Sequence, residues 1–591
     1  MKKNLLIIKQ SLKYLYKHNK LCLLCYFLRV ILCSIEPLIY VLFSKYIIDS
    51  LFPKLLLKKA IILVIIMVSL QFLFSFLGRI ISMKIENDAE KILYYQKMEF
   101  INHQKNIFYQ QTENTSFYDD YYNANEYINR GSNIHIMNQL QIIFSSLLTI
   151  VGLIYLLKEV SIIALGLSLI IYFIKLKFVK IKNKKIYEFE IKNTNSRRKE
   201  NFYVWGFTNS KYIKENRLFE TFPYISKEID RASIELTKKC VQQFNLSSKY
   251  SIIPIILDGI LIFIIYFSMV LSFKFRSLTV GDYSMILAAF ISFSSTINAI
   301  IKASSAINNE NFYFDKYNEI LKSYELENNK EKIKINKVNS IEFKNVSFQY
   351  PNTEVYALKN INLKITGEDF KKISIVGKNG SGKSTFIKLL MKLYSPLEGD
   401  IYINDINIKD IPNEDYYSLF SPVFQDYKIY LTSIKNNISF DEDEIIDDEL
   451  KQMDLYDKIL ELKYKEKTNI SKEFDQEGID FSGGERQKIA IARALHKKSC
   501  ITILDEPTAS LSSNSENQLY KMVLNCKDNI IFFISHRLSS CRFTDKIIVF
   551  DSGMIKEIGS HDELMNLNGI YTQLFLAQAE LYRLGGEENE E

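Results

Sequence analysis

One short stretch of this chain has the residue types and spacing needed to hold the phosphates of a nucleotide. Residues 377–385 form a complete G-x-x-x-x-G-K-[ST] phosphate loop. Its glycines let backbone N–H groups approach phosphate oxygens, Lys383 can reach the β- and γ-phosphates, and the Ser384 hydroxyl can bind Mg²⁺. The sequence therefore predicts a site for ATP and Mg²⁺. The residues that we predict to contact the nucleotide here are Gly377, Asn379, Gly380, Ser381, Gly382, Lys383, Ser384 and Thr385.

Two carboxylates follow an apolar run further along the chain. Asp505 and Glu506 come directly after the strand-like residues 500–504, and Pro507 follows them. A strand that ends in two carboxylates suits Mg²⁺ binding and water activation: Asp505 would hold the ion, directly or through water, and Glu506 would polarise the attacking water. A helix-capping acidic pair is the weaker reading because the pair ends a strand.

Two more polar motifs precede or follow predicted elements. The residues at 482–485 read Ser-Gly-Gly-Glu and stand immediately before a helical run, where a hydroxyl and two glycine amides make an anion site. His536 follows the apolar run 530–534, so its side chain would be exposed at the carboxyl edge of a sheet. A single histidine is usually structural, but the neighbouring motifs favour a site.

The elements around these motifs read as an α/β domain over residues 337–580. Apolar residues alternate at 341 and 343 and then out of phase at 346 and 348, which predicts a β-bulge near Asn345. The second alternating strand follows at 361–365. Continuous apolar runs then precede the phosphate loop (373–376), the two carboxylates (501–504) and His536 (530–534). Such runs are typical of a parallel sheet covered on both faces. An acidic tail follows at 581–591.

Residues 1–305 are far more apolar than the rest. At 591 residues the chain is too long for one core, so we expect at least two domains. Crossing a bilayer takes about 20 mostly apolar residues per helix. The six candidate spans are about 20–48, 60–82, 137–157, 160–178, 250–272 and 282–305. The last is rich in serine and threonine, so we expect it to line a cavity.

The connections between the spans alternate in length and charge. Two are long and polar, at about 83–136 and 179–249, and the other three are short. Lysine and arginine beside membrane ends mark the cytosolic side. We assign nine basic residues to the second connection, although the first two fall at the end of the candidate span before it. They are Lys175, Lys177, Lys180, Lys182, Lys184, Lys185, Arg197, Arg198 and Lys199. Both termini and both long connections are therefore predicted to be cytosolic, and residues 306–336 to form a polar helical linker.

The net charge of +7 fits such loops, and no nucleic-acid-binding signature accompanies the basic residues. We expect no nucleic-acid partner.

The seven cysteines show no disulfide framework, and Cys22 and Cys25 are expected to be small buried thiols. Near the start, apolar residues recur at helical spacing with lysines between them, which predicts a short helix on the cytosolic membrane face. These residues are Leu5, Ile8, Leu12, Leu15 and Tyr16.

Charged residues inside the spans are candidates for substrate contact, because burial of charge in lipid is costly. They are Arg29 and Glu36 in the first span, Asp258 in the fifth and Lys302 near the end of the sixth. Interhelical pairing, or snorkelling of the two basic side chains, is the alternative reading.

Taken together, these motifs resemble the ATPase domain of ABC transporters, and the six spans with long cytosolic connections resemble the exporter-type half-transporters. The resemblance implies that Tyr350 stacks on adenine, Gln425 binds Mg²⁺ at the lid, and His536 contacts the γ-phosphate. It also implies that two chains pair and clamp two ATP molecules between the phosphate loop of one and the signature of the other. The signature residues are Ser482, Gly483, Gly484 and Glu485.

The resemblance further implies short coupling helices in the long connections, which we place near Phe117–Ala124 and Lys211–Phe219. Two residues depart from the family pattern. Glu485 replaces the usual glutamine, and Ser512 stands where an aspartate is expected, which puts communication between the two sites in doubt.

The expected protein is thus a multidomain membrane protein, with an all-α six-helix transmembrane domain followed by an α/β P-loop NTPase domain. We expect a homodimeric ATP-driven exporter of a modified peptide in a bacterial plasma membrane. No cysteine-protease sequence precedes the first span, so we expect no cargo processing by this chain. Export of lipids or drugs, pairing with a different half-transporter, and an ATP-gated channel or sensor remain open. Six spans disfavour a soluble repair ATPase, and the fusion of both domains disfavours an importer.

Overall fold

The computed structural model divides the chain into two compact units. The first comprises Met1–Lys105 and Thr115–Tyr324, and the second comprises Asn106–Asn114 and Glu325–Glu591. The structure describes residues 2–52, 56–104, 107, 109–157, 162–206, 209, 212–275, 279–325, 333–351, 353–366, 371–507, 529–535 and 537–587.

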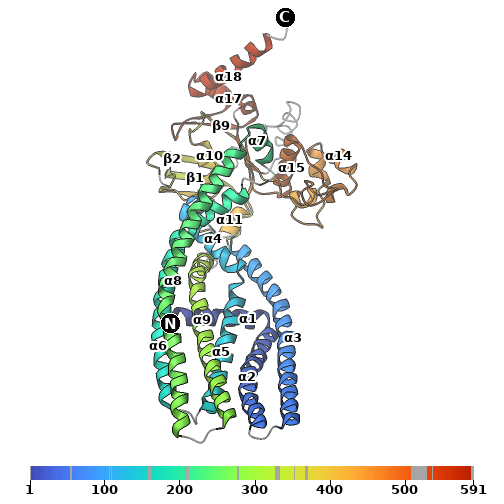
Figure 1. The fold of residues 1–591 in the computed structure, drawn as a ribbon. Helices are drawn as coiled ribbons and strands as arrows, with labels where there is room; N and C mark the ends of the chain where they lie inside the picture. Colours follow the sequence, from blue (N-terminus) through green and yellow to red (C-terminus); the bar gives the residue numbers. More distant parts are fainter. Residues whose placement is uncertain are drawn as a thin grey trace. The chain divides into compact units, whose positions relative to one another are not determined.

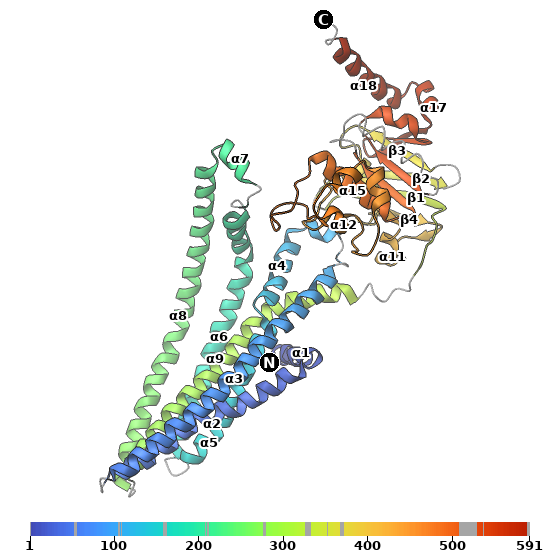
Figure 2. The same cartoon turned by 90° about the vertical axis from the view of Figure 1, so that its right-hand side faces the viewer.

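The first unit consists of helices, most of them very long (Figures 1 and 2). In chain order they are α1 (Lys2–His18), α2 (Lys20–Leu51), α3 (Leu57–Gln104), α4 (Thr115–Asn129), α5 (Ser132–Leu157), α6 (Ile162–Asn201), η2 (Phe202–Gly206), α7 (Ile213–Leu218), α8 (Phe222–Phe275) and α9 (Val280–Glu325). At about 1.5 Å per residue, α3 and α8 are more than twice as long as the roughly 30 Å apolar core of a bilayer. Both long polar connections are therefore largely continuations of the apolar helices.

Five of the described helices are long and apolar enough to cross a membrane. They are α2, α3, α5, α8 and α9, and they contain five of the six predicted spans. The remaining prediction, 160–178, falls on α6, and its first residues lie outside the described ranges. Helices α2 and α3 run side by side, as do α6 and α8 (Figure 1). Val41, Ala289, Phe290 and Phe293 lie in the buried core of this unit.

The predicted N-terminal helix is present as α1, which lies across the long helices of its unit (Figure 1). Its buried stripe is Ile7, Ser11 and Leu15, while Leu5 and Leu12 stay exposed. Ser11 donates a hydrogen bond of 2.9 Å to Asn133 on α5. Of the predicted apolar stripe, Leu15 is thus buried while Leu5 and Leu12 are exposed, and hydrophobic periodicity does not reveal the buried Ser11. The position of this helix on the membrane face stays a prediction.

The second unit begins with the short segment η1 (Tyr109–Glu113) and then contains an antiparallel sheet with the strand order β2-β1-β4-β5. The strands are β1 (Ser340–Gln349), β2 (Tyr356–Thr366), β4 (Glu398–Ile403) and β5 (Ile406–Asn407). The register of β1 against β2 shifts between Phe343 and Val346, and Asn345 has a φ of 50°. The predicted β-bulge is confirmed.

A second sheet has the order β10-β9-β3-β8-β7-β6. It comprises β3 (Lys372–Gly377), β6 (Phe420–Val423), β7 (Ile501–Asp505), β8 (Ile530–Ile534), β9 (Lys546–Asp551) and β10 (Met554–Gly559). All neighbouring pairs are parallel except β9 with β10. The predicted parallel sheet is confirmed, and its carboxyl edge carries the turns after β3, β6, β7 and β8.

The described helices of the second unit flank these sheets. They are α10 (Lys383–Leu390), α11 (Asn413–Tyr417), α12 (Ile434–Ile438), α13 (Asp447–Gln452), α14 (Tyr456–Leu460), η4 (Lys465–Lys467), α15 (Gly483–His496), η5 (Leu538–Phe543), α17 (His561–Asn566) and α18 (Ile570–Glu587). One apolar core joins α10 to both sheets, and Phe386 stacks against Phe343 with ring centroids 4.5 Å apart. That packing fixes the helix that begins at the phosphate loop.

Candidate nucleotide site

The phosphate loop turns sharply from β3 into α10, and two glycines make the turn possible. Gly377 has a φ of +147°, and a Cβ atom there would lie 2.2 Å from the carbonyl oxygen of Phe550. Gly382 caps α10 with a φ of +108°, where a Cβ would lie 2.9 Å from the carbonyl oxygen of Ala357. Since β9 and β2 approach this closely, any larger residue would displace the loop. The first N–H groups of α10 are left for an anion.

Two side chains of the phosphate loop, Lys383 and Ser381, have surroundings that bear on phosphate binding. The Lys383 ammonium donates hydrogen bonds to the carbonyl oxygens of Gly377 at 2.8 Å and Lys378 at 3.0 Å. Burial lowers the pKa of Lys383, while the charges of Glu506 and Asp505 act in the opposite direction. Ser381 Oγ is buried without a hydrogen-bond partner among the described residues. A buried hydroxyl without a partner is costly, so this loop is suited to a ligand oxygen.

The two predicted carboxylates lie at the end of β7, next to the loop. The Glu506 N–H donates to the carbonyl oxygen of Ile534 at 2.9 Å, and Glu506 has a φ of +49°. This left-handed backbone conformation is costly for a residue with a side chain and is typical of functional positions. Burial raises the pKa of Asp505 to about 6, and the nearby charge of Glu506 acts in the same direction. A dication would relieve both effects.

Gln425 connects the end of β6 to the same pair. Its Nε2 donates a hydrogen bond of 2.8 Å to Glu506 Oε2. Gln425 and Glu506 therefore lie together, as predicted, although Gln425 is 81 residues away in the sequence. Parallel order brings them together, because β6 and β7 are neighbours and end at the same edge.

These residues surround a cavity of about 540 Å³. Its lining consists of Tyr350, Ala357, Asn379, Gly380, Ser381, Gly382, Lys383, Ser384, Thr385, Gln425 and Glu506. The Tyr350 hydroxyl lies 3.0 Å from Thr385 Oγ1, and Lys388 Nζ lies 5.7 Å from the centre of the Tyr350 ring. The antiparallel sheet thus contributes an aromatic ring beside the phosphate loop, where the resemblance places adenine.

The predicted signature forms a helix start elsewhere on this unit. Ser482 and Glu485 form a reciprocal capping box at the N-terminus of α15. The Tyr427 hydroxyl donates to the carbonyl oxygen of Gly483 at 3.0 Å, and Lys458 pairs with Glu485 at 2.5 Å. None of the described residues that line the nucleotide cavity belongs to 482–485. The signature and the phosphate loop of one chain therefore do not share a cavity.

The residues available for Mg²⁺ are Ser384, Gln425 and Asp505. No cluster of three or more His, Cys, Asp or Glu side chains that could hold a metal occurs in the described ranges. Mg²⁺ is usually held by one or two carboxylates together with substrate phosphates, so a hydroxyl, an amide and one carboxylate fit it. His536 and Ser512 lie outside the described residues.

A contact that sequence reasoning missed ties η1 to the rest of the second unit. Tyr394 donates a hydrogen bond to a carboxylate oxygen of Glu113, and its ring lies edge-on to Tyr109 at 5.6 Å. The same ring also lies edge-on to Tyr350, with the ring centroids 5.4 Å apart. No sequence signal marked Tyr394, because nothing local shows that a segment some 280 residues earlier folds against it.

One predicted coupling element lies in the first unit. Phe117–Ala124 lies in α4 of the first unit, whereas the part of that connection that belongs to the second unit is Asn106–Asn114. The other predicted element contains α7, which is followed by Phe219, with Leu218 and Phe219 72% and 76% exposed. Lys211 lies outside the described residues.

The candidate charges in the helices of the first unit differ in their surroundings. Asp258 pairs with Lys175 at 2.5 Å, and the Lys175 side chain is only 4% exposed. Lys175 was predicted to belong to a basic connection. It is instead buried between α6, α8 and α9, where it also donates to Asn298 at 2.8 Å. Glu36 accepts a hydrogen bond from Ser75, and Lys302 is exposed. Interhelical pairing is thus the observed arrangement of Asp258.

Comparison with known proteins identifies the second unit. Residues 358–509 match the family described as ABC transporter. The similarity to ABC transporters therefore lies in this part of the chain. An ABC ATPase domain binds nucleotide, in agreement with the cavity beside the phosphate loop.

Two ABC relatives match a longer part of the chain. Over 399 residues it is 33% identical to the subtilin transport ATP-binding protein SpaT of Bacillus subtilis, covering 65% of this chain and 63% of that protein. Over 398 residues it is 32% identical to the nisin transport ATP-binding protein NisT of Lactococcus lactis subsp. lactis, covering 65% of each. The chain thus spans slightly less than two thirds of the length of these relatives.

The fold extends the ABC likeness over nearly the whole chain. A solved bacterial Atm1-family ABC exporter with ATP bound has a TM-score of 0.79, covers 95% of this chain and 99% of its own, and is 18% identical. The fold is that of an ABC exporter.

Proposed function

We propose that this protein is an ATP-driven exporter that moves an amphipathic peptide outward across a bacterial plasma membrane. The observation that carries the proposal is the nucleotide cavity, in which Gln425 and Glu506 meet beside the phosphate loop on a chain with membrane-type helices. The peptide class is supported by the printed functions of two relatives, which transport subtilin and nisin.

Each polar group of the cavity has a role in hydrolysis. The loop amides and Lys383 would neutralise the β- and γ-phosphates, and Tyr350 would stack on the base. Ser384, Gln425 and Asp505 would hold Mg²⁺, which supplies positive charge against the phosphates. Glu506 would orient and polarise the attacking water, a contribution worth roughly 10²–10⁴ in rate for such bases.

A second chain would complete the site. In one chain the signature at 482–485 lies outside the nucleotide cavity, which leaves the cavity open to the signature of a second copy. One chain holds both a phosphate loop and a signature, which supports a homodimer with two equivalent sites. Clamping of the ATPase domains would then drive the membrane helices between inward- and outward-facing states.

The test is ATP hydrolysis by the purified full chain in lipid nanodiscs, compared with Glu506→Gln and with the matched surface variant Glu473→Gln. We expect hydrolysis by the unmodified chain and by Glu473→Gln, a loss of at least about 100-fold in Glu506→Gln, and retained ATP binding. Stimulation by subtilin or nisin but not by a lipid or a drug supports peptide cargo. ATP binding without hydrolysis in the unmodified chain contradicts a self-sufficient pump.

A further inference from the structure

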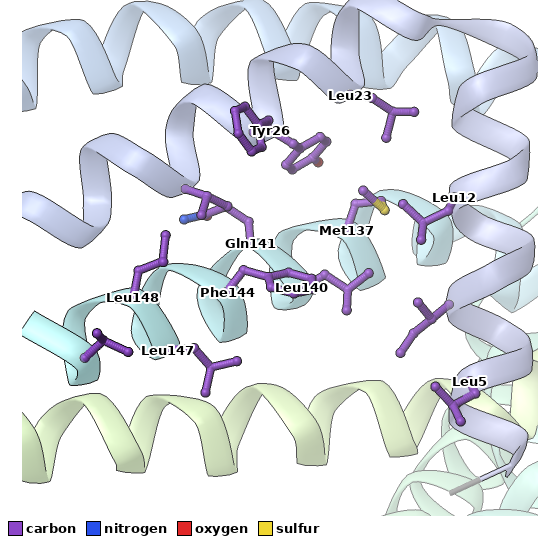
Figure 3. Close-up of a pocket in the computed structure, with 14 residues that line it drawn as sticks. Leu5, Leu12, Leu23, Tyr26, Met137, Leu140, Gln141, Phe144, Leu147 and Leu148 are labelled. Atoms are coloured by element: carbon purple, nitrogen blue, oxygen red, sulfur yellow. The ribbon is translucent and has the colours of Figure 1, made fainter.

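An apolar groove of about 630 Å³ lies between α1, α2 and α5 of the first unit (Figure 3). Helix α1 contributes Leu5 and Leu12, and α5 contributes Leu140, Phe144 and Leu147, all of them labelled around the space in Figure 3. The lining is aliphatic and aromatic, with Gln141 among it. The groove lies away from the nucleotide cavity and is not used by the proposed hydrolysis.

The groove is long enough to hold one lipid tail. Its lining on α5 runs from Met137 to Val151, which at 1.5 Å per residue is about 21 Å. One leaflet of the apolar core is about 15 Å deep, half of the roughly 30 Å of a bilayer. An extended acyl chain that starts at α1 therefore has room along α5. Phe144 and Val151 are 55% and 68% exposed, so the groove is open to the bilayer that we propose around it.

Two lysines of α1 follow directly after residues that line the groove. Lys9 follows Ile8 and Lys13 follows Leu12, so each lysine is rotated by about 100° around α1 from a residue that lines the groove. Both lysines are exposed, and among the described residues no ion pair involves either. Their apolar stems can lie along the groove while their ammonium groups reach the headgroup layer. The apolar groove suits the acyl chain of an anionic phospholipid. The two exposed ammonium groups beside it suit the phosphate of the same lipid.

We propose that this groove binds one anionic glycerophospholipid of the cytosolic leaflet, with an acyl chain along α5 and the phosphate at Lys9 and Lys13. The proposal rests on the proposed membrane placement of α1 and is independent of the exporter activity. A lipid bound there bridges α1 to α2 and α5 and fixes the angle at which α1 crosses them.

The test uses tryptophan fluorescence, because Trp205 is the single tryptophan of the chain. Trp205→Phe gives a dark background. On that background, Phe144→Trp places a groove reporter on α5, and Phe72→Trp places a control reporter on α3, where Phe72 is 70% exposed. The full chain is placed in phosphatidylcholine nanodiscs that contain a small fraction of brominated phosphatidylglycerol or of brominated phosphatidylcholine.

We expect brominated phosphatidylglycerol to quench the groove reporter at a much lower fraction than brominated phosphatidylcholine does. About fivefold per lysine gives roughly 30-fold for the pair. The variant Lys9→Gln with Lys13→Gln should abolish the preference. The matched variant Lys58→Gln with Lys59→Gln, an equal charge loss at the start of α3, should retain it.

Three outcomes would overturn the proposal. Equal quenching of the groove reporter by both lipids leaves no headgroup recognition, and an equal preference at the control reporter makes the effect one of bulk membrane charge. No quenching of the groove reporter by either lipid shows that protein, such as a second copy, fills the groove. Thermal unfolding of each variant, measured in parallel, separates loss of lipid preference from loss of the fold. ATP hydrolysis is not part of the readout, so failure here leaves the proposed function untouched.

Discussion

The two units of this chain bring polar side chains together in different ways. In the second unit, called the ATPase unit below, the phosphate loop, Gln425 and Glu506 each follow a parallel strand, so strand order alone places them at one edge. In the first unit, called the helical unit below, Lys175, Asp258 and Asn298 come from three long helices and meet only because α6, α8 and α9 pack together. Polar groups at strand ends can be found from sequence, whereas polar groups along helices depend on packing.

The two clusters also differ in whether their polar groups already have partners within the protein. The ATPase cluster surrounds a cavity and contains Ser381 Oγ, a buried hydroxyl without a partner among the described residues. The helical cluster satisfies its own charges, because Lys175 is held by Asp258 and Asn298 together. We therefore expect ligand-dependent effects from changes in the first cluster and effects on stability from changes in the second.

The largest expected effect comes from Lys383→Ala. This change removes the ammonium that the phosphate loop holds beside Gly377, so transition-state charge on the phosphates is no longer neutralised. ATP hydrolysis should fall by more than about 100-fold, and ATP affinity should fall with it. Lys378→Ala, at an exposed lysine of the same loop, should leave both within about twofold of the unmodified chain. Similar losses in both variants would show that Lys383 has no special place in the site. Both quantities can be measured in nanodiscs.

The second expected effect concerns stability of the helical unit. Lys175→Met leaves Asp258 without its partner and should destabilise the fold by about 1–3 kcal/mol, less than for a fully buried pair because Asp258 is 36% exposed. The double variant Lys175→Met with Asp258→Asn should recover most of the loss. Thermal unfolding in detergent measures the double-mutant cycle.

Lys302→Gln, at an exposed lysine, should change little and serves as the control for that cycle. If Lys175→Met leaves thermal stability intact but abolishes stimulation by peptide, the pair is a substrate site, and the contrast between the two units disappears.

A smaller effect is expected at the contact between η1 and the rest of the ATPase unit. Tyr394→Phe keeps the ring against Tyr109 and Tyr350 but removes the hydrogen bond to Glu113. Basal hydrolysis should stay within about twofold, while stimulation by peptide should fall roughly fivefold, because one charge-assisted hydrogen bond is worth about 1–3 kcal/mol. Tyr356→Phe, at an exposed tyrosine, is the control. Unchanged stimulation in Tyr394→Phe would show that the contact only anchors the segment.

The smallest effect is a pH dependence inside the ATPase unit. His496 Nδ1 lies 3.0 Å from Glu449, and its Nε2 contacts Glu444. Burial lowers the pKa of His496, but the hydrogen bonds and charges of both carboxylates outweigh this and hold the pKa above its usual 6.5. Its stabilising contribution is therefore complete below pH 6.5 and is lost as pH rises through the folded-state pKa.

The unfolding temperature should accordingly fall by about 1 °C more in the unmodified chain than in His496→Gln between about pH 6 and pH 9. Thermal unfolding of the full chain across that range measures the difference. Parallel curves for the two proteins would show that His496 is not charged in the folded state.

Most of the nucleotide site could be predicted from sequence because its parts are local. The phosphate loop must follow a strand and open a helix, and the carboxylates must follow a buried strand, so short patterns carry the geometry. The β-bulge at Asn345 was also predictable, since a change of phase in alternating residues has no other simple cause. The gathering of Tyr350, Gln425 and Glu506 around one cavity stayed a prediction until the strand order was known.

The helical unit shows what sequence patterns could not give. Hydropathy marked the apolar segments, but it gave no sign that α3, α6 and α8 continue unbroken far beyond the bilayer. It also placed Lys175 in a basic connection, because a count of charges does not distinguish an exposed lysine from one buried against Asp258. The polar residue Ser11 likewise occupies the buried stripe of α1, where its partner Asn133 is far away in the chain.

By itself, the sequence determined which residues can do chemistry and which segments can enter a membrane, because both depend on local residue type and spacing. The tertiary structure decided which of these meet. It paired Tyr394 with Glu113 and Lys175 with Asp258, and it formed the groove along α5, because contacts between residues far apart in the chain depend on how whole elements pack. Local chemistry is encoded in short stretches, whereas buried charge pairs and grooves exist only after packing has removed side chains from water.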